Sequence, residues 1–265
     1  MSTPFISRIG GILSADIAVP EHQREQSFYA RVLTTGAAPF WREDLMNSQG
    51  TPIIGLGARV PAYADLPLQW MPHIQVADVA KSVAHALAQG GRELMHGKDD
   101  NGASQYAVLL DPNGAAFGVI PRVPADALPP ADGGASDGAP APVGCIAWVD
   151  LTVPDAAATR DFYEKVVGWS GQDVEMTDAG ASYADYNMIA GDGTPGAGIC
   201  NARGVNKGLP PTWMIYLPVG DLAESLGLVT EKGGRIIAQT SGADGAISYA
   251  IIEDPVGATL GLMQG

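Results

Sequence analysis

The chain of 265 residues is poor in basic residues and in cysteine. It has 15 lysines and arginines against 29 aspartates and glutamates, a formal net charge of −14. Nucleic-acid backbones and anionic lipid surfaces attract proteins through clustered Lys and Arg, so neither is an expected partner. Cys145 and Cys200 are too few for a disulfide framework and fit no zinc-knuckle spacing. We therefore expect two reduced, buried thiols and a cytoplasmic protein.

Long apolar runs are also absent. No stretch approaches the 18 or more apolar residues of a membrane-spanning helix. The first apolar run is broken by Asp16 and is too short and polar for a secretory signal. What is abundant is glycine, with 34 residues, close to twice its usual share of about 7%. This excess predicts many tight turns and short strands, and the 46% of hydrophobic residues is ample for a packed core.

The chain contains one sequence pattern twice. Segments of its first half match segments of its second half at two fixed offsets, 134 and 143 residues, so that Pro20 matches Pro154 and Trp70 matches Trp213. The matched segments are 18–33 with 152–167, 67–97 with 210–240, and 111–121 with 254–264. The step between the offsets places nine extra residues in the second copy. A tandem duplication with one insertion explains this pattern.

We predict two domains joined by a tether. The first copy covers residues 5–121 and the second covers 144–264. Residues 122–143 between them are rich in proline, alanine and glycine and have no apolar periodicity. Such a composition is typical of a solvated linker.

Each copy alternates between strand and helix periods. We expect strands over 11–19 and 146–153 and helices over 24–33 and 157–167. A region of short strands follows each helix. A second strand then begins at a tryptophan, a second helix ends at a Gly-Gly pair, and a D-P-x-G turn precedes the last strand. The pattern predicts four units of βαβββ type.

This order of motifs resembles the vicinal oxygen chelate superfamily of glyoxalases, bleomycin-resistance proteins and extradiol dioxygenases. The motifs that carry the resemblance are Phe-Tyr at 28–29 and 162–163 and D-P-x-G at 111–114 and 254–257. Both copies resemble the family, as in two-copy glyoxalase-like proteins. The resemblance implies an α+β fold of tandem glyoxalase-like domains, with four βαβββ modules forming curled sheets around small-molecule cups.

The resemblance also implies a divalent metal held by His, Gln and Glu side chains that face into the cup. The family's spacing puts the ligand positions at Ser14, Met71 and Gly118 in the first copy and at Trp148, Met214 and Gly261 in the second. None of these residue types is a normal ligand of a hard metal. All four histidines, His22, His73, His85 and His96, lie in the first copy. We therefore predict no metal site and no cofactor.

Other polar residues take the cup face on the first strand of each copy. Strand side chains alternate between faces, so Asp16 shares the face of Ser14, and Asp150 shares the face of Trp148. An acid in an apolar strand is costly unless it is paired or solvated. Asp16 and Asp150 are candidate general bases with a raised pKa. The alternative is an acid that anchors a loop or faces solvent.

A second strand contributes His73 in the first copy and Tyr216 at the equivalent position of the second. We interpret both as candidate catalytic residues, with His73 as a proton shuttle. The alternatives are a satisfied core histidine and a packed tyrosine ring. The candidate ligand-binding residues share these strand faces or lie beside them: Ser14, Met71, Gln75, Trp148, Thr152 and Met214.

Two classes of function fit these residues. The first is a metal-free binding protein that sequesters or carries a hydrophobic metabolite. The second is a lyase or isomerase that uses Asp with His or Tyr for proton transfer. A metal-dependent glyoxalase or dioxygenase remains only if the strand register is shifted. The expected partner is a small-molecule ligand, and the expected assembly is a monomer or homodimer.

Overall fold

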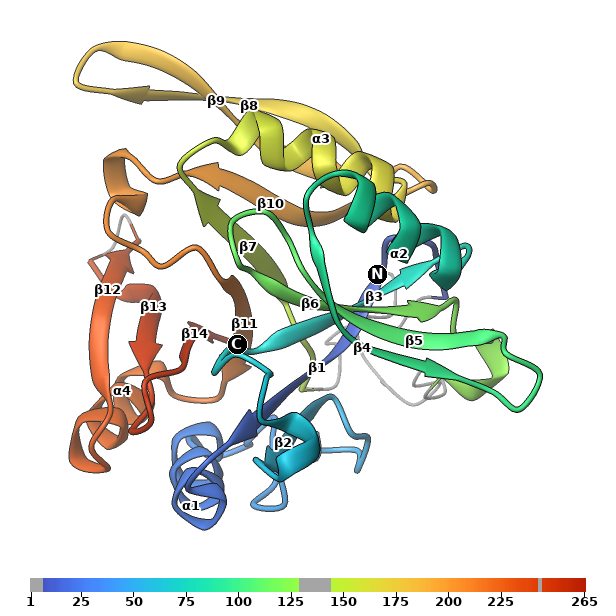
Figure 1. Cartoon of the computed structure of the whole chain (residues 1–265). Helices are drawn as coiled ribbons and strands as arrows, with labels where there is room; N and C mark the ends of the chain where they lie inside the picture. The colour runs from blue at the N-terminus through green and yellow to red at the C-terminus, as the bar shows by residue number, and fades with distance from the viewer. Residues whose placement is uncertain (1–6, 129–143, 243–244) are drawn as a thin grey trace.

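The strands of each sequence copy form one curled sheet of their own (Figure 1). The structure is a computed structural model and describes residues 7–128, 144–242 and 245–265. The first sheet has six strands in the order β2-β1-β3-β6-β5-β4. Its elements are β1 (Ile12–Val19), α1 (His22–Leu33), β2 (Ile54–Ala58), β3 (Met71–Val76), α2 (Val79–Ala88), β4 (Arg92–Lys98), β5 (Ser104–Leu110) and β6 (Ala116–Pro121).

The second sheet has eight strands in the order β12-β13-β14-β11-β7-β10-β9-β8. Its elements are β7 (Trp148–Val153), α3 (Ala156–Val167), β8 (Ser170–Asp178), β9 (Ala181–Ile189), β10 (Pro195–Asn201), β11 (Trp213–Val219), α4 (Leu222–Glu231), β12 (Arg235–Ser241), β13 (Ile247–Glu253) and β14 (Thr259–Gln264). Three short 3₁₀ turns lie at Pro61–Tyr63, Ala125–Ala127 and Gly204–Asn206. The α+β fold of tandem glyoxalase-like units is thus confirmed.

The domain boundaries stay a prediction. Each sheet uses strands of one copy, in agreement with a division near the segment 122–143. Most of that predicted linker, residues 129–143, lies outside the described residues.

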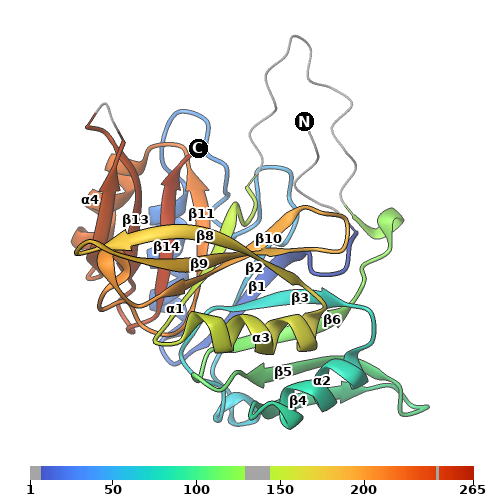
Figure 2. The same cartoon turned by 90° about the horizontal axis from the view of Figure 1, so that it is seen from above.

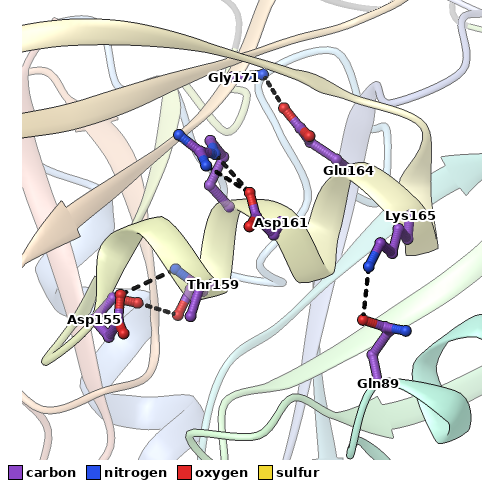
Figure 3. Close-up of polar contacts among 9 residues, drawn as sticks. Gln89, Asp155, Thr159, Asp161, Glu164, Lys165 and Gly171 are labelled. Atoms are coloured by element: carbon purple, nitrogen blue, oxygen red, sulfur yellow. Dashed lines mark hydrogen bonds and ion pairs between the residues drawn. The ribbon is translucent and has the colours of Figure 1, made fainter.

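Local sequence signals explain where the helices begin and end. The carboxylates of Asp78, Asp155 and Asp221 accept hydrogen bonds from the backbone of the first turns of α2, α3 and α4. In α3 the hydroxyl of Thr159 also donates to the carbonyl oxygen of Asp155, at 2.8 Å (Figure 3). Helix α3 ends at Gly168, whose φ of 88° is left-handed and suits glycine.

The two copies differ after their first helix. In the second copy, β8 and β9 form a long hairpin that extends the sheet (Figure 2). In the first copy, residues 34–53 form isolated bridges between Trp41 and Asn47 and between Met46 and Pro52. This segment packs on the second copy instead, because Trp41 Nε1 donates to the carbonyl oxygen of Pro218 at 2.8 Å. The short strands expected here are therefore reduced to these bridges and β2.

The helices pack where the copies meet, α1 against α4 and α2 against α3. The same hydrogen bond occurs on both sides of this interface. Ser82 Oγ donates to the carbonyl oxygen of Val166 at 2.6 Å, and Ser225 Oγ donates to that of Val32 at 2.8 Å. The sequence offsets relate these two bonds, so the copies meet with approximate twofold symmetry. A further bond on the α2–α3 side joins Lys165 Nζ to Gln89 Oε1 at 3.0 Å (Figure 3).

The Phe-Tyr and D-P-x-G motifs also meet across the interface. Tyr29 donates its hydroxyl proton to Asp254 Oδ2 at 2.8 Å, and Tyr163 donates to Asp111 Oδ2 at 3.4 Å. Each tyrosine oxygen in turn accepts a bond from an indole Nε1, of Trp70 at 3.2 Å and of Trp213 at 2.9 Å. These buried groups therefore satisfy one another between the copies.

Candidate functional site

The first cup is the concave face of the first sheet, and strand pairing brings its candidate residues together. In the antiparallel pair of β1 and β3, Ser14 lies opposite His73 and Asp16 lies opposite Met71. In the parallel pair of β3 and β6, His73 lies beside Gly118. Directly paired residues share a face, so all five lie on one side of the sheet. The other side, with Ala15, Ile17 and Val19, belongs to the main core.

The second cup has the same register with different side chains. Asp150 lies opposite Met214, and Trp148 lies opposite Tyr216. Tyr216 in turn lies beside Gly261 in β14. The residues at the predicted ligand positions therefore share one face of the sheet in each copy.

The first cup contains a cavity of about 660 Å³. This volume is in the range of sites for small molecules, about 300–1,000 Å³. The residues that line it are Asp16, Ile17, Ala18, Gly55, Leu56, Gly57, Tyr63, Leu66, Met71, His73, Met95, Gln105, Tyr106, Ala107, Val108, Gly118 and Ile120. Its floor is a small apolar cluster of Ala18, Leu66, Met71 and Ala116, separate from the main core.

Three polar side chains form a chain along one wall of the first cup. Ser14 Oγ lies 2.9 Å from His73 Nδ1, and His73 Nε2 lies 3.5 Å from Asp16 Oδ2. Burial lowers the pKa of His73, although Asp16 opposes this effect. At neutral pH we therefore assign a neutral imidazole that accepts from Ser14 and directs its Nε2 proton toward Asp16. Ser14 does not line the cavity and serves to orient His73.

Glycines leave room for these polar groups in both cups. A Cβ at Gly118 would lie 2.7 Å from Cδ2 of His73, and a Cβ at Gly55 would collide with the Asp16 carboxylate. In the second copy, a Cβ at Gly261 would collide with the ring of Tyr216, and a Cβ at Gly198 would collide with the Asp150 carboxylate. The glycines at the family's metal-ligand positions thus make space for an aromatic side chain.

The second cup has a more buried acid. Trp148 Nε1 donates to Asp150 Oδ1 at 2.6 Å. Burial raises the pKa of Asp150 to about 6, while hydrogen bonds from Trp148 and Tyr216 oppose the rise. Burial and the nearby Asp150 carboxylate raise the pKa values of Cys200 and Tyr216. The arrangement supplies one acceptor that titrates near neutral pH beside two protonated neighbours.

Of the predicted ligand-binding residues in the first copy, Met71 lines the cavity, whereas Ser14 and Gln75 do not. The side chain of Gln75 is fully buried, and its Oε1 accepts from the backbone N–H of Val123 at 2.9 Å. Its Nε2 donates to the carbonyl oxygen of Gly11. Gln75 therefore holds the ends of the first copy together. Thr152 is buried on β7, where it pairs with Cys200 of β10.

Several cup residues lie outside the repeated segments and motifs of the sequence. Tyr63 and Leu66 come from the loop before β3, and Tyr106 comes from β5. In the second cup, Cys200 lies near Asp150, and the ring of Tyr249 packs edge-on against Tyr216 at 5.7 Å. Cys200 could have been found from the sequence, because it lies 143 residues after Gly57 and so occupies the equivalent position of the second copy.

The donor set does not fit the metal that the family resemblance implies. The ligand positions carry Ser14, Met71 and Gly118 in one cup and Trp148, Met214 and Gly261 in the other. The serine hydroxyl is bonded to His73, and the other five offer no hard donor. Within residues 7–128, 144–242 and 245–265, no three His, Cys, Asp or Glu side chains gather into a metal-binding group.

Comparisons with known proteins place both copies in one family. The glyoxalase-like domain family matches residues 14–120, and the glyoxalase/bleomycin resistance protein/dioxygenase superfamily matches residues 145–262. The chain therefore belongs to this superfamily, the vicinal oxygen chelate superfamily. None of the helices in the described part of the chain combines the length and apolarity of a membrane span.

Two curated relatives match parts of the chain. "Putative glyoxylase CFP32" of Mycobacterium tuberculosis is 31% identical over 118 residues, 44% of this chain and 44% of that protein. "Anthracycline biosynthesis protein DnrV" of Streptomyces peucetius is 28% identical over 171 residues, 64% of this chain and 57% of that protein. Each match spans about half of the relative's length.

Solved structures share the fold across nearly the whole chain. A catechol 2,3-dioxygenase aligns with a TM-score of 0.53 at 12% identity, covering 98% of this chain and 89% of that one. A variant of 4-hydroxymandelate synthase from Streptomyces coelicolor aligns with a TM-score of 0.54 at 12% identity, covering 97% of this chain and 93% of that one. At such identities the likeness concerns the fold alone.

Proposed function

We propose that this chain is a small-molecule binding protein whose first cup sequesters or carries a hydrophobic metabolite without a resident metal. The observation that carries the proposal is the 660 Å³ cavity over the first sheet. Its walls are mostly apolar, and its polar groups are few, as is usual in binding pockets. A relative named for anthracycline biosynthesis is in keeping with a small-molecule role.

Binding of a neutral apolar probe tests the proposal. N-phenyl-1-naphthylamine fluoresces when it leaves water, so a saturable rise with one equivalent is expected. Gly57 lines the cavity and has open space at its Cβ, since the nearest contact is Ile17 O at 3.8 Å. The variant Gly57→Phe should fill the cavity and weaken binding at least about tenfold, which corresponds to about 1.4 kcal/mol.

The matched control is Gly191→Phe, at an exposed turn where a Cβ meets nothing within 4 Å. It should bind the probe like the parent protein. An absence of saturable binding, or equal binding by Gly57→Phe, would overturn the proposal. Metal analysis of protein purified without chelator tests whether the protein lacks a resident metal. One equivalent of Zn, Ni, Fe or Mn per cup would contradict that proposal.

The second cup favours a second candidate, proton transfer on a carbonyl compound. Asp150 supplies a buried acceptor whose pKa is about 6, close to the pH at which a general base works best. In this reaction the carboxylate takes a proton from the carbon next to a carbonyl group and returns it to carbon. Tyr216 lies beside Asp150 and keeps its own proton, because burial and that carboxylate raise its pKa.

Deuterium exchange tests this candidate. The α-protons of 2-tetralone, an apolar ketone, should exchange with D₂O faster in the presence of the protein, as followed by ¹H NMR. Asp150→Asn should remove the acceleration, whereas Asp173→Asn, an exposed acid of β8, should retain it. Exchange at the uncatalysed rate, or full acceleration by Asp150→Asn, would remove the candidate.

A further inference from the structure

The charged groups that line the first cavity are of one sign, negative. Of the seventeen residues that line it, Asp16 is the single carboxylate, and none is a lysine or an arginine. The side chain of Asp16 is 55% exposed, so its carboxylate is open to a ligand in the cup. Gly55 lies directly beside it in β2, which leaves the wall at this point without a side chain.

His73 does not neutralise this carboxylate at neutral pH. Its imidazole is 22% exposed and lies 3.5 Å from Asp16. Burial lowers the pKa of His73 below its usual 6.5, so the ring is neutral there and offers a single N–H. A carboxylate beside apolar walls gains more from a cation than it would in water, because the local dielectric is lower.

The other walls suit an aromatic body. Met71, Leu66 and Val108 provide apolar surface at the floor and sides. Tyr63 and Tyr106 line the cavity and are 37% and 42% exposed, so their rings are available for stacking or for contact with a cation. The net charge of −14 also attracts cations and repels anions at long range.

We propose that the ligand of the first cup is an arylalkylamine, an aliphatic amine that carries an aromatic ring system, with its protonated nitrogen paired to Asp16 and its rings against Met71 and the cavity floor. The proposal rests on the proposed function, since it names the chemical class of the ligand of that same cavity. It disfavours carboxylates and phosphates as ligands, because none of the seventeen lining residues in the described part of the chain is a lysine or an arginine.

Three compounds with one ring system test the class. Calorimetry at pH 7 and low salt would compare 2-naphthylmethylamine, 2-naphthylmethanol and 2-naphthoic acid, which are cationic, neutral and anionic. The amine should bind about tenfold more tightly than the alcohol, as expected of a partly exposed ion pair that a ligand desolvates. The acid should bind most weakly.

Variants then assign the preference to one carboxylate. Asp16→Asn should bring the amine and the alcohol to within about twofold of each other, and Asp16→Glu should restore a preference for the amine. Asp65→Asn is the matched control: it removes one negative charge from an exposed position of the nearby loop outside the cavity lining. It should keep the preference of the parent protein.

The outcomes separate the two proposals. If none of the three compounds binds, the proposed function fails along with the ligand class. If the alcohol and the acid bind as tightly as the amine, the cavity binds small molecules but the arylalkylamine class is wrong. A preference for the amine that survives in Asp16→Asn would likewise overturn the assignment to Asp16.

Discussion

The two cups of this protein share the register of their central strands and differ in side chains. Gly55 and Gly198 lie beside an aspartate in each cup, and Gly118 and Gly261 lie beside an aromatic side chain. Around this shared frame, the first cup places Ser14 where the second places the much larger Trp148. Duplication thus preserved the positions that need glycine and allowed the side chains between them to diverge.

The acid on the first strand shows the consequence of this divergence. Asp16 is half exposed in a cavity and has a neutral histidine beside it. Asp150 receives the Trp148 indole N–H, and burial raises its pKa to about 6. The same residue type is therefore suited to pairing with a ligand in one cup and to exchanging a proton in the other.

The largest expected loss of stability concerns the hydrogen bonds of Tyr29 at the interface between the copies. Tyr29→Phe removes a buried hydroxyl that donates to Asp254 at 2.8 Å and accepts from Trp70. The expected loss is about 2–3 kcal/mol of unfolding free energy, because the buried Trp70 Nε1 loses its acceptor and Asp254 Oδ2 loses the tyrosine donor. Tyr163→Phe should lose less, since its bond to Asp111 is longer, at 3.4 Å.

Urea unfolding measures both losses, with Tyr183→Phe as a partly exposed control. Equal effects of Tyr29→Phe and Tyr163→Phe would show that the two halves of the interface are energetically the same. A loss below about 0.5 kcal/mol in both would mean that these bonds do not hold the copies together.

A buried acid at one half of the interface predicts a pH-dependent stability. Glu25 on α1 is fully buried near Asp254, whereas the equivalent residue of α3 is Thr159. Burial, with the nearby Asp254, raises the pKa of Glu25 from 4.5 to about 8. The folded state therefore holds a proton that the unfolded state loses above pH 4.5, so stability falls as pH rises through this window.

Glu25→Gln should remove this loss of stability at high pH. Its Tm should be close to that of the parent near pH 4 and exceed it by several degrees at pH 9, since each unit of pKa shift corresponds to about 1.4 kcal/mol and 1 kcal/mol to roughly 2–4 °C in a protein of this size. Glu21→Gln, an exposed acid one turn earlier, is the control. A Tm difference that does not change between pH 4 and 9 would contradict the assignment.

The smallest expected effect concerns Asp150 in the second cup. Its pKa of about 6 lies above the usual 3.8, so its contribution to stability is complete below pH 4 and is lost as pH rises to about 6. Tyr216→Phe removes a hydrogen bond that favours the carboxylate, and should move the pKa of Asp150 higher. NMR titration of the carboxyl carbon measures the shift, with Tyr249→Phe as the control that leaves this bond in place.

The repeat and its periodicity predicted much of the fold. The first strand of each copy was placed within two residues of its bounds, because apolar and polar residues alternate up to a Val-Pro pair. Helix α1 begins two residues earlier than expected, at His22, whose Nε2 lies 2.9 Å from the carbonyl oxygen of Leu56. Such a contact with a later strand has no local sequence signal.

The site was predictable only along the strands that carry the motifs. Period-two alternation placed Asp16, Met71 and His73 on one face, and strand pairing shows that they share it. Tyr63 and Tyr106 reach the same cavity from a loop and from β5, which depends on the order of strands in the sheet. The bond from Tyr29 to Asp254 joins residues from different copies, and no local pattern specifies it.

We propose the first cup as a small-molecule site from which the second cup has diverged. A crystal structure of the protein soaked with 2-naphthylmethylamine shows which cup the amine occupies. We expect density in the cavity of the first copy, with the amine nitrogen at hydrogen-bond distance from Asp16 and the rings against Met71. Density in the second cup alone, or in neither cup at saturating amine, would contradict the proposal.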